Sequence, residues 1–185
     1  LLSLLPQLQK LKLITAAEFS ALQKQIYPAL FAEKGNTLGK EGVLALWREL
    51  PKSLRHEPEL LDALIQQLIT MGAEADAEEL LLESLRKHFQ PALLPLAAKL
   101  QHPGTTLTQL VEKLQSQLPE TERAATMGFI YLQQKAYAQA QSALEQALQQ
   151  QPTNRAVLLG LAKTMEQQRL FEKAVYYYQR ATANH

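Results

Sequence analysis

Two consecutive stretches of sequence decide the fold, TERAATMGFIYLQQKAYAQAQSALEQALQQQPTN (121–154) and RAVLLGLAKTMEQQRLFEKAVYYYQRATANH (155–185). A shift of 34 residues places the first on the second and matches residues of similar character at six positions. The matched pairs are Met127 with Leu161, Gly128 with Ala162, Tyr131 with Met165, Ala140 with Ala174, Leu144 with Tyr178, and Ala147 with Ala181. Matches at one fixed period indicate an internal repeat.

Each repeat has the residue sizes that two packed helices require. Small residues such as Gly128, Ala140 and Ala147 allow the two helices of a hairpin to cross closely. The larger Leu144 and Tyr178 fill the space between one hairpin and the next. This order of large and small residues resembles the tetratricopeptide repeat, which implies stacked helical hairpins.

Helical periodicity continues upstream of the two regular repeats, and nothing alternates with the period of a strand. The sequence therefore predicts an all-α fold, a tetratricopeptide-repeat-type helical hairpin solenoid with an N-terminal helical region. Residues 1–57 form that region and pack on the solenoid. About three helical hairpins are expected over 58–185, with 58–87 and 88–120 as degenerate units and 121–154 and 155–185 as regular repeats.

Capping residues set the expected helix ends in the N-terminal region. Thr15 and Glu18 form a capping box ahead of a helix over 16–34, which Gly35 and Asn36 end. A helix over 40–50 follows and contains Trp47. Its expected role is core packing, and the alternative is a hot spot for a partner.

The middle unit, 88–120, is expected to be irregular. Its first helix is short, 92–100, and breaks at the His-Pro-Gly sequence of 102–104. Its second helix starts at Thr106, with Gln109 as a capping-box partner, and runs to Pro119.

The composition excludes several classes of function. The chain has 185 residues and a net charge of +1, from 19 Lys and Arg against 18 Asp and Glu, which argues against nucleic acid as the main partner. It has no Cys, so disulfides, thiol nucleophiles and Cys-ligated metals are excluded. No apolar run reaches the roughly 18 residues that span a bilayer.

The sequence lacks motifs for catalysis or metal binding. Residues 35–41, GNTLGKE, have neither the spacing nor the hydroxyl residue of a phosphate-binding loop. The histidines, His56, His88, His102 and His185, include no i, i+4 pair. Acidic residues over 74–83 fit a solvated helix start. We therefore expect no enzyme activity, no catalytic residue, no metal site and no cofactor.

The first helix of each hairpin is expected to line a concave groove that binds a partner. The repeat frame places fourteen residues there: Glu59, Asp62, Gln66 and Ile69, then Glu122, Ala125, Phe129, Leu132 and Gln133, then Ala156, Leu159, Lys163, Glu166 and Gln167. The groove is of mixed charge, without a dense clamp of Lys and Arg for a C-terminal carboxylate. In the nearby aromatic run, Tyr178 is expected in the core, Tyr176 against the neighbouring hairpin, and Tyr177 more exposed.

A second resemblance rests on residues 42–58, GVLALWRELPKSLRHEP. A Trp, a Pro four residues later and a basic run before the first hairpin are similar to the HemY family of proteobacteria, inner-membrane tetratricopeptide-repeat proteins associated with haem biosynthesis. The order of parts is also similar. The resemblance implies two transmembrane helices ahead of these residues and a soluble C-terminal domain at the cytoplasmic face of a bacterial inner membrane. It carries over no catalytic residue.

The sequence therefore favours a non-enzymatic protein-interaction scaffold that supports late haem (porphyrin) biosynthesis by binding enzymes of the pathway in the groove. One alternative is a haem- or tetrapyrrole-binding or haem-sensing regulatory domain, with a His or Tyr on the iron. A second alternative is a generic envelope assembly scaffold. Flavin-dependent oxidase chemistry is excluded, because no Gly-x-Gly-x-x-Gly motif follows a strand.

Overall fold

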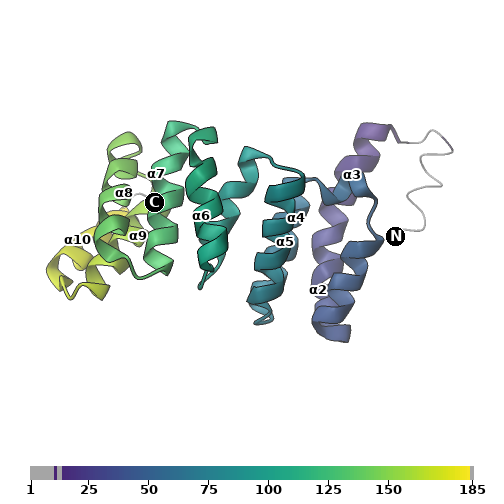
Figure 1. Ribbon diagram of the computed structural model, residues 1–185, viewed down its shortest axis with the longest axis horizontal. Helices are drawn as coiled ribbons and strands as arrows, with labels where there is room; N and C mark the ends of the chain where they lie inside the picture. Colours follow the sequence, from purple (N-terminus) through teal and green to yellow (C-terminus); the bar gives the residue numbers. More distant parts are fainter. Residues whose placement is uncertain (1–10, 12–13, 184–185) are drawn as a thin grey trace. The chain divides into compact units, whose positions relative to one another are not determined.

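Helices form every regular element among the residues that the computed structural model describes, residue 11 and residues 14–183 (Figure 1). The described chain divides into two compact units, one up to Ala77 and one from Glu78. The elements are α2 (Ala16–Glu49), α3 (Lys52–Arg55), α4 (Pro58–Thr70), α5 (Glu74–Lys87), the 3₁₀ helix η1 (Pro91–Lys99), α6 (Thr105–Leu114), the 3₁₀ helix η2 (Gln115–Gln117), α7 (Glu120–Gln133), α8 (Tyr137–Gln150), α9 (Arg155–Gln167) and α10 (Phe171–Ala183).

Within the described residues, no strand occurs, so the predicted all-α class is confirmed. None of the described helices is long and apolar enough to cross a membrane. The predicted boundary between an N-terminal region and the hairpins, at residue 57, stays a prediction.

In the first unit, α2 consists of two helical segments that meet at Gly39, whose φ of 67° and ψ of −165° are not helical. The predicted capping box is confirmed, because Thr15 accepts from the Glu18 amide and the Glu18 carboxylate accepts from the Thr15 amide. The predicted helix end at Gly35 and Asn36 is wrong. Helix α2 continues past both, because Gly35 allows close packing on α4: a Cβ atom there would lie 2.6 Å from Nε2 of Gln67.

An aromatic cluster holds the two segments of α2 together. Phe31 is fully buried, and its ring centroid lies 6.4 Å from that of Tyr27 and 6.2 Å from that of Trp47, edge-on to the indole. Such pairs add to the burial of large apolar area. Trp47 is itself buried, which confirms core packing as its role and contradicts the alternative of an exposed hot spot.

In the second unit, the middle segment departs from the prediction at two places. Residues 91–99 form the 3₁₀ helix η1 and not an α-helix, because in an α-helix the Pro95 ring would clash with the carbonyl four residues back. Helix α6 begins at Thr105 and has no side-chain cap, so the predicted capping box with Gln109 is wrong. Both carboxylate oxygens of Glu78 accept instead from the Gly104 amide, at 3.1 Å.

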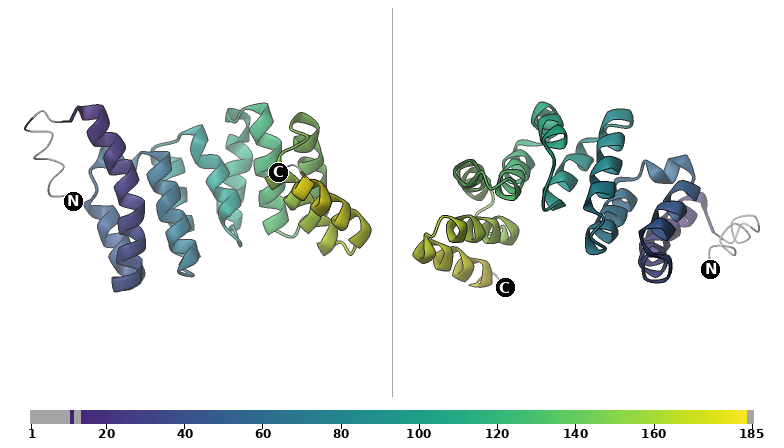
Figure 2. Two further views of the ribbon diagram at one scale, coloured as in Figure 1. Left: turned by 180° about the vertical axis from the view of Figure 1, so that it is seen from behind. Right: turned by 60° about the horizontal axis from the view of Figure 1, so that its bottom comes forward.

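Helices α7 with α8, and α9 with α10, form the two regular hairpins, which lie side by side in both views of Figure 2. All the matched small residues of the repeat are buried, as predicted. Leu144 lies between the hairpins and is fully buried. A Cβ atom on Gly128 would approach its Cγ to 2.6 Å, and one on Gly160 would approach its Cδ1 to 3.2 Å.

The aromatic run in α10 differs from the prediction. Tyr176 is 53% exposed, whereas Tyr177 and Tyr178 are half-buried against the cluster of Leu144, Leu161 and their neighbours. The expected positions of Tyr176 and Tyr177 are therefore wrong. In the repeat frame Tyr176 matches Ser142, which is also exposed, and the guanidinium of Arg180 lies over the Tyr176 ring at 5.6 Å.

The turns inside the two hairpins have the same backbone conformation 34 residues apart. Lys135 and Arg169 have left-handed φ values of 62° and 61°. The next amide in each turn donates to a carbonyl five residues back, Ala136 to Tyr131 and Leu170 to Met165, both at 2.9 Å. The internal repeat found in the sequence therefore extends to the backbone of the turns.

Enlarging a small repeat residue should destabilise the hairpins. Ala140 and Ala174 are buried where two helices meet, so replacement of either by Leu forces neighbouring side chains from their preferred rotamers. We expect Ala140→Leu or Ala174→Leu to lower the free energy of unfolding by roughly 1–3 kcal/mol and the melting temperature by several degrees. Ala138→Leu, at an exposed position of the same helix, is the control. Equal melting of all four proteins would contradict the repeat register.

Glycine should be favoured at the two left-handed turn positions. A side chain with a Cβ atom is strained there, so Lys135→Gly and Arg169→Gly should each raise the free energy of unfolding by about 0.5 kcal/mol in urea denaturation. Gly72→Ala makes the opposite change, from glycine to a residue with a Cβ atom, at another left-handed position. Gly72 has a φ of 72° and no atom close to its Cβ position, so the loss of about 1 kcal/mol reports backbone strain alone.

Candidate functional site

The predicted groove residues fall on α4 in the first unit and on α7 and α9 in the second. Helices α7 and α9 are neighbours, and the ring of Phe129 lies against the backbone of α9. A Cβ atom on Gly160 would be 2.7 Å from Cε1 of that ring, so a glycine is needed for this approach. The two helices carry ten of the fourteen predicted residues, five on each, and we call these ten residues the α7–α9 face.

The α7–α9 face has an apolar strip with polar groups around it. Ala125, Phe129, Leu132 and Leu159 are half-buried, so part of each apolar side chain stays accessible. The other six residues of the face are the half-buried Gln133 and five exposed residues. These are Glu122 on α7 and Ala156, Lys163, Glu166 and Gln167 on α9. This combination of partly accessible apolar area with a polar rim is typical of a surface that binds a peptide segment.

Two polar residues of the face also hold neighbouring helices. The Tyr178 hydroxyl of α10 donates to Oε2 of Glu166 at 3.1 Å, and the Tyr137 hydroxyl of α8 donates to Oε1 of Gln167 at 3.3 Å. Burial and the bond to the Glu166 carboxylate raise the pKa of Tyr178. Glu166 and Gln167 therefore each have an internal role beside any contact with a partner.

The four predicted residues of α4 belong to the first unit. Glu59 and Gln66 are exposed, whereas Asp62 and Ile69 are half-buried. Lys24 of α2 lies 2.5 Å from Oε2 of Glu57 and 3.6 Å from that of Glu59, and the Glu57 carboxylate raises the pKa of this lysine. Partner binding by these four residues, and by the ten of the α7–α9 face, stays a prediction.

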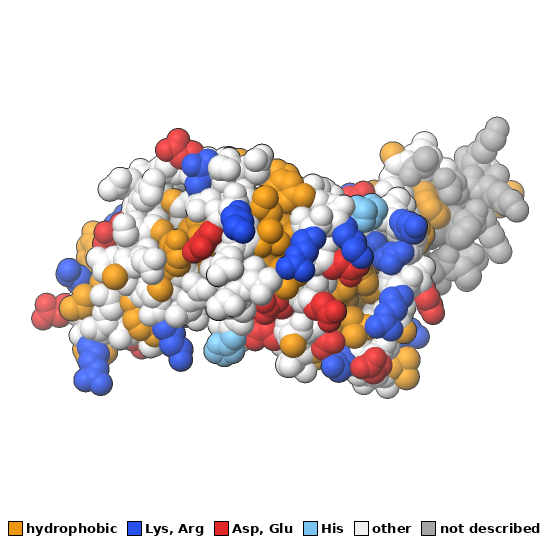
Figure 3. All heavy atoms as spheres, in the orientation of Figure 1, with side chains coloured by type: hydrophobic (Ala, Val, Ile, Leu, Met, Phe, Trp, Pro, Cys, Tyr) orange, Lys and Arg blue, Asp and Glu red, His pale blue; other side chains and the backbone are white. Residues whose placement is uncertain are grey.

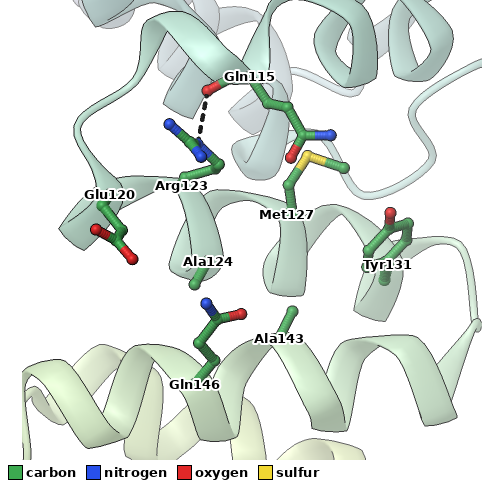
Figure 4. Close-up of a pocket in the computed structure, with 8 residues that line it drawn as sticks. All are labelled: Gln115, Glu120, Arg123, Ala124, Met127, Tyr131, Ala143 and Gln146. Carbon is green, nitrogen blue, oxygen red and sulfur yellow. Dashed lines mark hydrogen bonds between the residues drawn. The ribbon is translucent and has the colours of Figure 1, made fainter.

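A hollow that the sequence did not indicate lies where α7 meets η2 and α8 (Figure 4). Its volume is about 210 Å³, and its lining consists of Gln115, Glu120, Arg123, Ala124, Met127, Tyr131, Ala143 and Gln146. Burial raises the pKa of Tyr131 on its wall. The hollow is smaller than the roughly 300–1,000 Å³ of ordinary small-molecule sites, which makes a structural role the better explanation.

Arg123 organises this hollow. Its Nε donates to the carbonyl of Gln115 at 3.1 Å (Figure 4). Its Nη2 donates to the carbonyls of Ser116 at 3.4 Å and Leu118 at 3.2 Å. The cation therefore satisfies carbonyls at the end of α6 and η2, where the helix dipole favours positive charge. A sequence signal existed, because Arg123 aligns in the repeat frame with the buried Val157, and a charge at a core position of the repeat is unusual.

Loss of the Arg123 guanidinium should weaken the link between η2 and α7. We expect Arg123→Met to lower the free energy of unfolding by about 1–3 kcal/mol, because two half-buried hydrogen bonds to the Gln115 and Leu118 carbonyls are lost. Arg123→Lys should recover only part of this loss, since a single ammonium cannot reproduce the planar fork. Arg86→Met, at an exposed position, is the control for urea denaturation, and an equal effect at both sites would contradict this role.

Two further hollows lie in the second unit. One of about 320 Å³ is lined by Glu145, Leu148, Gln149 and Arg180, and one of about 370 Å³ lies at the turn into α10. None of the three hollows is lined by a histidine or by a predicted groove residue. Among the described residues no group of three His, Asp or Glu side chains could hold a metal ion, and His185 lies outside them.

One comparison with known proteins, to a family model, agrees with the hairpin geometry. A family model described as tetratricopeptide repeat matches residues 131–185. No curated protein matches the sequence. Among solved structures, the chain is similar to a MamA mutant, with 15% sequence identity and a TM-score of 0.47 over 89% of this chain and 99% of that one, values too low to bear on function. The repeated hairpins and the family model over residues 131–185 together show an all-α fold of tetratricopeptide-repeat type.

Proposed function

We propose that the α7–α9 face binds a segment of a protein partner, and that the chain acts as a non-enzymatic interaction scaffold. Stacked helical hairpins of this type are a protein-interaction fold, which supports the general class. The observation that carries the proposal is the half-buried apolar strip of Ala125, Phe129, Leu132 and Leu159 on two adjacent helices.

The charges around the strip restrict the kind of partner. Glu122 and Glu166 are negative and Lys163 is positive, all three exposed, so the rim has both signs. Over the surface seen in Figure 3, acidic and basic side chains are likewise interspersed. We therefore propose that the partner segment places apolar side chains against the strip and has both acidic and basic side chains beside them. Complementary charges of this kind fix the orientation of a partner more than they add to its affinity.

We further propose that the partners are enzymes of late haem synthesis, and that the chain works at the cytoplasmic face of a bacterial inner membrane. The support for this proposal is the resemblance of residues 42–58 to the HemY family. In the structure, Trp47 of this segment belongs to the core of the first unit. We therefore assign residues 42–58 a structural role, shared with the HemY family, and we assign the partner contacts to the α7–α9 face.

Co-purification tests both levels of the proposal. The immobilised chain is incubated with detergent-solubilised lysate of its host, and the retained proteins are identified by mass spectrometry. We expect haem-pathway enzymes to be retained by the native chain and by Lys113→Glu, and to be lost with Lys163→Glu. Both lysines are exposed, so the two variants change the same charge on and off the face.

The outcomes separate the surface from the pathway. Equal retention by both variants would place the interaction elsewhere and contradict the role of the α7–α9 face. Retention of other proteins that is lost only with Lys163→Glu would keep the face and contradict the assignment to haem synthesis.

A further inference from the structure

Exposed apolar side chains gather at the start and along one side of α10. Leu170, Phe171, Val175 and Tyr176 are between 39% and 62% exposed. Two of them, Phe171 and Val175, are four residues apart, which places both on one side of the helix together with Tyr178. We call these three residues the α10 face.

The internal repeat shows what the same face does in the preceding hairpin. A shift of 34 residues places Tyr137, Gln141 and Leu144 of α8 on the three residues of the α10 face. In α8 all three contact α9: Leu144 is buried beside Gly160, the Tyr137 hydroxyl donates to Gln167 at 3.3 Å, and Gln141 accepts from Gln168 at 3.3 Å. The α8 face is therefore a helix-binding surface.

We propose that the α10 face binds an amphipathic helix of a protein partner, which stacks on α10 as α9 stacks on α8. This surface shares no residue with the α7–α9 face, although the Tyr178 hydroxyl donates to Glu166 of that face. The partner helix continues the repeat interface that α8 and α9 already form, so its geometry and its chemistry both follow from that interface.

The partner helix needs a small residue at its centre. In α9 this position is Gly160, where a Cβ atom would lie 3.2 Å from Leu144. On α10 the place of Leu144 is taken by Tyr178, which is larger, so the requirement for a small residue is stronger. A second copy of the α10 face does not offer one, because Phe171, Val175 and Tyr178 are all large.

The partner helix also needs apolar residues where α9 has Gln167 and Gln168. In α8 these amides meet the Tyr137 hydroxyl and the Gln141 amide, whereas α10 has Phe171 and Val175 at the same positions. A buried amide without a hydrogen-bond partner is costly, so apolar side chains replace the two glutamines. The hollow of about 370 Å³ beside Leu170 and Phe171 offers room for them, with Arg169, Glu172 and Lys173 on its rim.

A synthetic helix tests the proposal with the full chain. The probe is a labelled peptide with the sequence of residues 154–168 in which Gln167→Leu and Gln168→Leu are introduced, and binding is measured by fluorescence anisotropy. We expect saturable binding that Val175→Glu weakens at least tenfold. Tyr176→Glu is the matched control: Tyr176 is 53% exposed against 52% for Val175, but it aligns with the exposed Ser142, outside the α10 face.

Variants of the peptide test its chemistry. Gly160→Leu in the peptide should abolish binding, and the peptide with its two native glutamines should bind more weakly. Absence of saturable binding, or equal weakening by Val175→Glu and Tyr176→Glu, would overturn the proposal. Sedimentation velocity adds a further decisive outcome, because a dimer of the native chain that Val175→Glu converts to a monomer would show that a second copy covers the face instead.

Discussion

The second unit depends on the close approach of three helices around Leu144. Its side chain fills the space between Gly128 of its own hairpin and Gly160 of the next, and no Cβ atom fits at Gly128 without movement of the leucine. Because interiors are packed to near crystal density, this contact fixes the distances from α7 to α8 and from α8 to α9 at once. The remaining core residues, Val157, Leu161 and Met165 among them, pack around it.

The proposed binding surface follows from the same contact. Gly160 lets the Phe129 ring lie on the backbone of α9, and this leaves Phe129 half-buried in the middle of the α7–α9 face. Glu166 and Gln167, at the edge of that face, hold the hydroxyls of Tyr178 and Tyr137. A partner that contacts Glu166 and Gln167 would therefore contact residues that also bind α10 and α8. Partner binding would then be coupled to the stability of the two hairpins.

Helix α7 follows the irregular segment of the second unit and begins the first regular hairpin. One residue that differs between the two repeats suits α7 to this neighbour. At the position where α9 carries the buried Val157, α7 carries Arg123, which bonds to the carbonyls at the end of α6 and η2. Val157 packs in the apolar cluster of the second unit, whereas Arg123 donates to carbonyls of the 3₁₀ turn η2 and its C-cap. The repeat therefore keeps its spacing while its chemistry changes to suit an irregular neighbour.

Local sequence determined the all-α class, the capping box of Thr15 and Glu18, the 34-residue period and the burial of its small residues, because these depend on contacts near in sequence or on a fixed period. Only the tertiary structure decided three other features. Helix α2 passes Gly35 since α4 packs there, Glu78 replaces Gln109 at the start of α6, and Tyr177 is covered while Tyr176 is not. Each depends on residues distant in sequence, whose approach the local pattern does not specify. The positions of the predicted groove residues on α7 and α9 followed from the period, whereas the close approach of Phe129 to α9 required Gly160.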